Sequence, residues 1–202
     1  MALRSPLLFA AETTWALVVP TPTRAFFFAS YLLSVSQLMK TLLLLRHAKA
    51  ENDAPGLTDL ERALNERGEE QARSIGTFIK QQNLKLDLVL CSTAVRARQT
   101  AELVLAAAQL TASVLYDRRI YEASPEGLSE VITEVEDGMS TVLLVGHNPV
   151  MEEFLRALTG QTEPMTTGTL VKIDFDTDAW SGVVQDQGSL VWIQRPQALA
   201  TD

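Results

Sequence analysis

The chain has 202 residues, a formal net charge of −8, two histidines and a single cysteine. An acidic chain lacks the broad basic face that nucleic acids and anionic membranes require, so no nucleic-acid partner is expected. One cysteine excludes an internal disulfide framework and a multi-thiolate metal site, and it fits a cytoplasmic location. No spacing of possible metal ligands stands out, and we therefore expect no metal or other cofactor.

Residues 1–38 differ in composition from the rest of the chain. They are apolar, interrupted by Pro and Thr, and almost uncharged. Ser and Gln break the apolar stretch before it reaches the roughly 18 residues of a membrane span, so no stable membrane insertion is expected. Because Met39 directly precedes the first predicted strand, we interpret residues 1–38 as a disordered extension from a mis-assigned start codon. A targeting or weakly anchoring segment and an ordered extra element are the alternatives; residues 39–202 form the domain.

Three short apolar runs predict strands that are buried on both faces, as in a parallel sheet. The runs lie at 41–45 (TLLLL), 86–92 (LDLVLCS) and 141–147 (TVLLVGH). Between and after them, apolar residues recur at steps of three and four, which is typical of amphipathic helices. The predicted helical stripes comprise Ala72, Ile75 and Ile79; Ala97, Ala101, Val104 and Ala108; Leu128, Val131, Ile132 and Val135; and Val150, Phe154, Leu155 and Leu158.

The last part of the chain changes character. Residues 169–175 (TLVKIDF) alternate between polar and apolar, and residues 189–195 (SLVWIQR) follow after a polar connection that contains Gly. This pattern predicts two antiparallel strands at or near a sheet edge. Together with the preceding alternation of strands and helices, it predicts an α/β fold. We expect a three-layer α/β/α sandwich with a mostly parallel central sheet and antiparallel C-terminal edge strands.

Cationic or near-cationic side chains follow each of the three buried strands. Arg46 and His47 come directly after the first, Arg96 lies one helical turn beyond Ser92 at the end of the second, and His147 ends the third. In an open α/β sheet, ligands bind outside the carboxyl ends of the strands. Two arginines and two histidines are therefore expected to converge there. A compact dianion such as a phosphoryl group fits them, because arginine presents forked donors to phosphate oxygens.

A histidine among guanidinium groups is held in its neutral form, and a neutral imidazole is a nucleophile. Its attack on phosphorus would give a phosphohistidine intermediate. The arginines and the second histidine can neutralise the phosphoryl oxygens without a metal. Taken singly, each of these residues has a structural explanation: a cap for the histidines and a surface ion pair for the arginines. Cys91 is expected to be a small, buried, unreactive side chain.

Four segments resemble motifs of the histidine phosphatase superfamily, whose fold is the phosphoglycerate mutase-like fold. The stretch LLLLRHAKAE (42–51) resembles its Arg-His-Gly motif, in the Arg-His-Ala-Lys form of the small SixA-like phosphohistidine phosphatase branch. The segments LNERGEEQA (64–72), CSTAVRARQTAE (91–102) and VGHNP (145–149) are similar to the family's further motifs, in the family's order. The resemblance covers most of residues 40–195.

The resemblance implies a role for each basic residue of the expected cluster. It implies that His47 is the nucleophile, and that Arg46, Arg96 and His147 bind the phosphoryl group. Arg62 resembles a basic residue that small SixA-like members carry before the first helix, which implies that it binds phosphate near the pocket.

The proton donor is less clearly marked. Larger members of the family use Glu or Asp to protonate the leaving oxygen, a step worth about 10²–10⁴-fold. Glu122 is our candidate, because it follows the strand-like residues 113–121. Glu126 fits the first turn of a helix that Ser124 would cap. A phosphohistidine substrate needs a strong acid less, because its imidazole departs more readily than an alkoxide.

The predicted connection at residues 109–124 leaves little room for a large lid. An open pocket suits a phosphate displayed on a protein surface or a varied small phosphoester. We therefore predict a metal-independent phosphatase that forms a phosphohistidine intermediate and acts on phosphohistidine in proteins. The alternatives are a small-molecule phosphomonoesterase of the same superfamily and, in another class, a phosphate-binding module without turnover.

Overall fold

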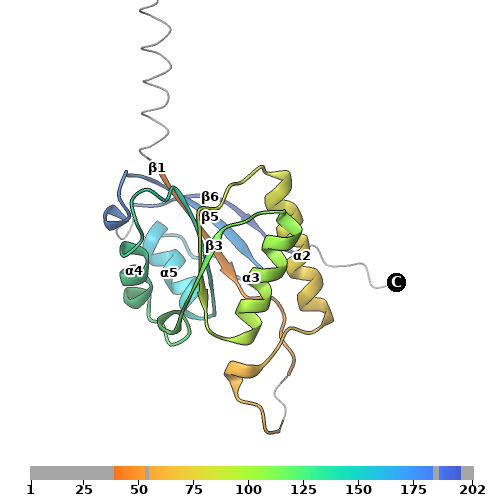
Figure 1. Ribbon diagram of the computed structural model, residues 1–202. Coiled ribbons are helices and arrows are strands. Elements are labelled where there is room, and N and C mark those ends of the chain that lie inside the picture. Colours follow the sequence, from red (N-terminus) through yellow and green to blue (C-terminus); the bar gives the residue numbers. More distant parts are fainter. Residues whose placement is uncertain (1–38, 53–54, 184–186, 197–202) are drawn as a thin grey trace, which may run out of the picture. The chain divides into compact units, whose positions relative to one another are not determined.

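The computed structural model describes residues 39–52, 55–183 and 187–196, so the predicted N-terminal extension lies outside the described residues. A six-stranded sheet forms the middle layer, with strand order β3-β2-β4-β1-β5-β6 (Figure 1). The strands are β1 (Met39–Arg46), β2 (Leu88–Ser92), β3 (Ser113–Asp117), β4 (Thr141–Gly146), β5 (Leu170–Asp176) and β6 (Ser189–Gln194).

The direction of the strands confirms the predicted fold class. Strands β3, β2, β4 and β1 pair in parallel, β5 pairs antiparallel with β1, and β6 pairs antiparallel with β5. Residues 42–45 of β1 have no exposed surface, because helices cover both faces of the sheet. The central strand is therefore a continuous leucine run rather than an alternating one.

Four helices form the two outer layers: α2 (Glu66–Gln81), α3 (Val95–Ala108), α4 (Pro125–Thr133) and α5 (Val150–Thr159). Helices α2 and α3 cover one face of the sheet, and α4 and α5 cover the other (Figure 1). Leu43 and Leu45 pack into the core beneath α2 and α3, while Leu42 and Leu44 pack into the core beneath α4 and α5. Every predicted helical stripe is buried. No helix within the described ranges combines the length and apolarity needed to cross a bilayer.

The first turn of α2 holds the segment that follows β1. A side chain at position 68 would overlap the backbone carbonyl of Lys49, so only Gly68 allows the close approach. Gln71 Oε1 accepts the backbone N–H of Lys49 at 3.0 Å, and Asn65 caps the helix by accepting the N–H of Gly68 at 2.9 Å. The Gly and Gln of the LNERGEEQA segment thus fix the loop just beyond His47.

Helix α3 holds the same loop from the other side. Thr100 Oγ1 accepts the N–H of Ala48 at 3.1 Å and donates to the carbonyl of Arg96 at 2.6 Å. Gln99 Oε1 accepts the N–H of Leu64 at 2.7 Å. Thr100 therefore connects the end of β1 to the start of α3, while Gln99 connects α3 to Leu64, shortly before α2.

Gly76 lies where α2 packs against α3, and it gives a test of this packing. A Cβ at that position would overlap the carbonyl of Val104 and lie 2.7 Å from the Cβ of Ala107. We expect Gly76→Ala to lower the free energy of unfolding by about 1–3 kcal/mol through overpacking. This loss should outweigh the gain of about 1 kcal/mol that alanine brings to a helix. Urea denaturation measures the difference.

Gly127→Ala in α4 is the matched control for Gly76→Ala. The added Cβ would lie 3.7 Å from its nearest neighbour, Ser124 Oγ, which is an ordinary contact. We expect the free energy of unfolding to stay the same or to rise by up to about 1 kcal/mol. Stabilisation of both variants would contradict the tight contact between α2 and α3.

Candidate active site

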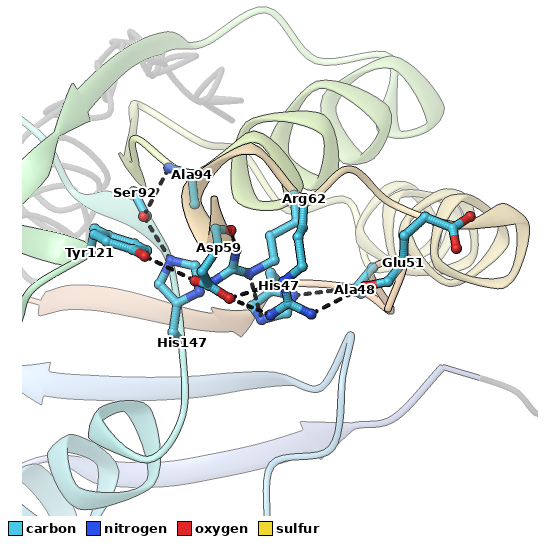
Figure 2. Close-up of polar contacts among 10 residues, drawn as sticks. His47, Ala48, Glu51, Asp59, Arg62, Ser92, Ala94, Tyr121 and His147 are labelled. Atoms are coloured by element: carbon cyan, nitrogen blue, oxygen red, sulfur yellow. Dashed lines mark hydrogen bonds and ion pairs between the residues drawn. The ribbon is translucent and has the colours of Figure 1, made fainter. Parts of the chain in front are cut away.

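Three of the predicted residues meet at the carboxyl edge of the sheet. Figure 2 shows two of them, His47 and His147. His47 follows β1, Arg96 is the second residue of α3, and His147 follows β4. The ring centroids of the two histidines lie 5.0 Å apart. Arg96 Nε donates to His47 Nε2 at 3.3 Å. Arg96 and His47, which are 49 positions apart in the chain, are thus in direct contact.

His47 is held with its Nε2 unprotonated. Its Nδ1 lies 2.7 Å from the carbonyl of Ala48, and because a carbonyl only accepts, Nδ1 carries the ring proton. Burial lowers the pKa of His47 to about 4, with the positive charges of Arg96 and Arg46 acting in the same direction and the bond to Ala48 opposing them. At neutral pH the ring is an uncharged imidazole whose Nε2 faces Arg96.

His147 is neutral for similar reasons. It is 8% exposed, and its burial, followed by the nearby His47 and Arg96, lowers its pKa to about 3. Its Nε2 lies 2.7 Å from Ser92 Oγ, and the same hydroxyl oxygen accepts the backbone N–H of Ala94 at 3.3 Å. The buried end of β2 therefore sets the orientation of the second imidazole.

The cluster contains buried polar atoms whose hydrogen-bonding capacity is unused. Within the described ranges, Arg46 Nε, His147 Nδ1 and Asn148 Oδ1 are buried and have no hydrogen-bond partner. Arg46 itself is oriented by its Nη1, which donates to the carbonyl of Met165 at 2.6 Å. An unsatisfied buried group costs about 1–3 kcal/mol. An anion with several oxygens would satisfy nitrogen donors of this kind.

Asp59 is a site residue that the sequence analysis did not identify. It lies in the 3₁₀ turn η1 (Asp59–Glu61) and binds Arg96 Nη2 with Oδ2 at 2.8 Å. The hydroxyl of Tyr121 donates to the same oxygen at 2.9 Å. Partial burial raises the pKa of Asp59, but the hydrogen bonds from Arg96, Arg62 and Tyr121 outweigh it and hold that pKa well below its usual range. The carboxylate is therefore ionised throughout the neutral range.

Arg62 lies at the rim of this cluster. Its Nε donates to Asp59 Oδ1 at 2.9 Å, and its Nη1 donates to the carbonyl of Glu51 at 3.1 Å. Its charge is one of those that lower the pKa of His47. The spacing of three residues between Asp59 and Arg62 within one 3₁₀ turn is the sequence signal that could have identified the acid.

Glu122, the predicted proton donor, is paired with Arg118, which is not part of the cluster. Its Oε1 accepts from Arg118 Nη2 at 2.8 Å, and both side chains are exposed. No hydrogen bond or ion pair within the described residues links Glu122 to the two histidines. The 3₁₀ turn η2 (Arg118–Ile120) follows β3, and it directs Tyr121 toward the cluster instead. Ser124 caps α4, as interpreted, with Glu126 in its first turn.

Cys91 lies in β2 with no exposed surface. Burial raises the pKa of its thiol to about 12, so the thiol is protonated and unreactive, as expected. Among the described residues, no group of three or more His, Cys, Asp or Glu side chains is arranged to hold a metal ion. The chemistry that the cluster offers is that of a neutral imidazole nucleophile beside guanidinium and imidazole donors.

Known proteins match this chain over the region that carries these residues. A family model described as the histidine phosphatase superfamily (branch 1) matches residues 42–135. A curated protein of Mycobacterium tuberculosis, described only as uncharacterized, is 40% identical over 105 residues. The alignment covers 52% of this chain and 63% of the relative, so the chain spans less than two thirds of that relative's length.

Two solved structures are similar over most of the described chain. One, from Agrobacterium tumefaciens, is described as a candidate phosphohistidine phosphatase SixA. It is 32% identical with a TM-score of 0.67, and the match covers 78% of this chain and 98% of that chain. The other is a protein histidine phosphatase SixA complexed with tungstate. It is 25% identical with a TM-score of 0.66, and the match covers 77% of this chain and 97% of that chain.

The protonation of the two histidines gives a direct test of the site's electrostatics. Because His47 and His147 are the chain's only histidines, ring NMR signals can be assigned with one single-histidine variant. We expect neither ring to titrate near the usual histidine pKa of about 6.5. Both folded-state pKa values are lowered, to about 4 and about 3, so the unfolded chain takes up protons first. Stability should therefore fall as the pH drops below about 6.5. A ring that titrates at its usual pKa would contradict the described burial.

Proposed function

Because the chain belongs to the histidine phosphatase superfamily, we propose that it is a phosphatase that forms a phosphohistidine intermediate on His47 and acts on phosphohistidine in proteins. One observation carries the proposal: a neutral imidazole presents the lone pair of Nε2 among buried cationic and N–H donors. The similar structure with tungstate, an oxyanion, supports an anion site in this fold. The names of both structural neighbours support phosphohistidine as the substrate class.

In the first step, His47 Nε2 attacks phosphorus. A P–N bond to His47 forms while the P–N bond of the substrate breaks, and the leaving imidazole keeps the electron pair. In the structure the Nε–H of Arg96 donates to His47 Nε2 at 3.3 Å. When Nε2 bonds to phosphorus, this N–H would instead donate its hydrogen bond to a phosphoryl oxygen. Arg46 Nε, which is buried and has no partner among the described residues, supplies a second donor.

His147 supplies a third donor if its proton lies on Nδ1. Ser92 Oγ accepts the N–H of Ala94, which leaves the hydroxyl proton available for His147 Nε2 at 2.7 Å. That arrangement places the ring proton of His147 on the buried, unpartnered Nδ1. We therefore assign to Ser92 the role of fixing the tautomer of His147.

In the second step, water attacks the phosphohistidine, the P–N bond breaks, and inorganic phosphate leaves with the oxygen of the water. The electron pair returns to His47 Nε2, which regenerates the nucleophile. Guanidinium groups at the phosphoryl oxygens supply the positive charge that Mg²⁺ supplies in many phosphoryl transferases. We therefore propose that turnover needs no added metal.

The nucleophile is tested by the substitution His47→Asn. We expect kcat/KM to fall by at least about 10³-fold, the scale of losing a covalent nucleophile. Brief exposure of the wild-type protein to phosphohistidine-bearing protein should give an acid-labile phosphoenzyme, which mass spectrometry detects after quenching in alkali. A His47→Asn protein that still forms this phosphoenzyme would exclude His47 as the nucleophile.

The second prediction concerns Arg96, with Arg119 as its control. Removing a preorganised donor to the transition state should lower kcat of Arg96→Ala by about 10²–10³-fold. Arg119 binds Asp117 and Glu134 at the surface, so Arg119→Ala should stay within about twofold of the wild type. Assays with EDTA present should give the same rates as assays without it. Equal losses in both arginine variants, or a rate that EDTA abolishes, would count against the mechanism.

A further inference from the structure

We propose that Asp59 selects the leaving group: its carboxylate binds the ring N–H of a phosphorylated imidazole and disfavours phosphoesters with additional negative charge. This inference rests on the proposed function and deepens it, because it concerns the part of the substrate beyond the phosphoryl group. It assigns a role to a carboxylate that neither the nucleophile nor the phosphate donors require.

Asp59 is far more exposed than Arg96 and His147, the buried members of the cluster. Its side chain is 49% exposed, whereas Arg96 is 4% and His147 is 8% exposed. The carboxylate and the reactive nitrogen lie at two ends of one guanidinium: Arg96 Nη2 binds Asp59 at 2.8 Å, and Arg96 Nε donates to His47 at 3.3 Å. We infer that a group joined to a phosphoryl at His47 leaves the site past this carboxylate.

The carboxylate is held firmly in that place (Figure 2). Arg62 binds Oδ1, while Arg96 and the Tyr121 hydroxyl bind Oδ2. Arg96 Nη1 also donates to the backbone carbonyl of Asp59, which fixes the 3₁₀ turn as well as the side chain. Two hydrogen bonds from Arg62 and one each from Arg96 and Tyr121 hold the carboxylate. Because these four bonds use its acceptor positions, the ring N–H of a substrate would replace one of them.

Asp59 is poorly suited to be the general acid that an alkyl phosphate requires. Hydrogen bonds from the two arginines and Tyr121 hold its pKa well below the usual range, so it carries no proton to donate. Glu122 is bound to Arg118 at the surface. An alkoxide leaving group would therefore depart without assistance from either carboxyl group.

A phosphorylated imidazole needs no such donor. When the nitrogen that is not bonded to phosphorus carries a proton, the ring is a cation, and cleavage of its P–N bond releases neutral imidazole. The electron pair of that bond goes to the leaving nitrogen, and the proton stays where it was. A fixed carboxylate favours this protonated form, as aspartate does for histidine in the Ser-His-Asp triad. Asp59 would assist departure by accepting a hydrogen bond rather than by giving a proton.

The experiment compares two small substrates in the full-length wild type and Asp59→Asn. Phosphoimidazole offers the ring N–H after protonation, and p-nitrophenyl phosphate offers none. We expect Asp59→Asn to lower kcat/KM for phosphoimidazole about tenfold, the effect of losing a charge-assisted hydrogen bond. The value for p-nitrophenyl phosphate should change by much less, because this substrate offers no ring N–H, so the ratio of the two should fall.

Two measurements separate selectivity from a merely structural role. Inorganic phosphate should bind Asp59→Asn as tightly as the wild type or more tightly, because the substitution removes a negative charge beside Arg96. Glu61→Gln is the matched control: it removes the same charge two residues away, where the carboxylate accepts hydrogen bonds from Thr58. Its substrate ratio should equal that of the wild type.

Each other outcome overturns a stated part of the account. Two results in Asp59→Asn would overturn the inference and leave the proposed function standing. One is an unchanged ratio of kcat/KM for the two substrates, and the other is lost phosphate binding. A wild-type protein that turns over neither phosphoimidazole nor a phosphohistidine-bearing protein would overturn the proposed function, and the inference with it.

Discussion

His47 keeps its Nε2 free of a proton, and the proposed mechanism depends on this constraint. The carbonyl of Ala48 holds the ring proton at Nδ1, and Arg96 Nε donates to Nε2. Both contacts require the loop after β1 to lie against α3, where Thr100 binds the Ala48 amide. The burial that builds the core is also what lowers the pKa of His47, because a charged imidazole would lose its hydration there. Folding therefore also produces the neutral imidazole that the proposed mechanism uses as its nucleophile.

The sheet and the convergence of His47 with Arg96 and His147 were predictable because they follow from long-range rules. Continuous apolar runs make parallel strands, and the carboxyl ends of such strands share an edge. The position of Asp59 and the ion pair of Glu122 with Arg118 were not predicted, because short 3₁₀ turns decide where these side chains lie. If such a turn were longer or shorter by one residue, a different side chain would enter the site. Apolar periodicity does not reveal the length of these turns.

The motifs around the cluster act mainly as supports. Gly68 and Gln71 fix the loop from α2, and Gln99 and Thr100 fix it from α3, yet none of these four contacts the ring of His47 through a hydrogen bond in the described residues. Their spacing positions the backbone that carries the histidine. The cationic cluster is thus built into an otherwise acidic chain by backbone placement, and its positive charge stays local while the net charge is −8.

A crystal structure with orthovanadate bound tests the central claim most directly. The account predicts vanadium bonded to His47 Nε2, with its oxygens accepting from Arg46 Nε, Arg96 Nε and His147 Nδ1. Vanadate bound away from His47, or held there with either imidazole turned aside, would contradict it.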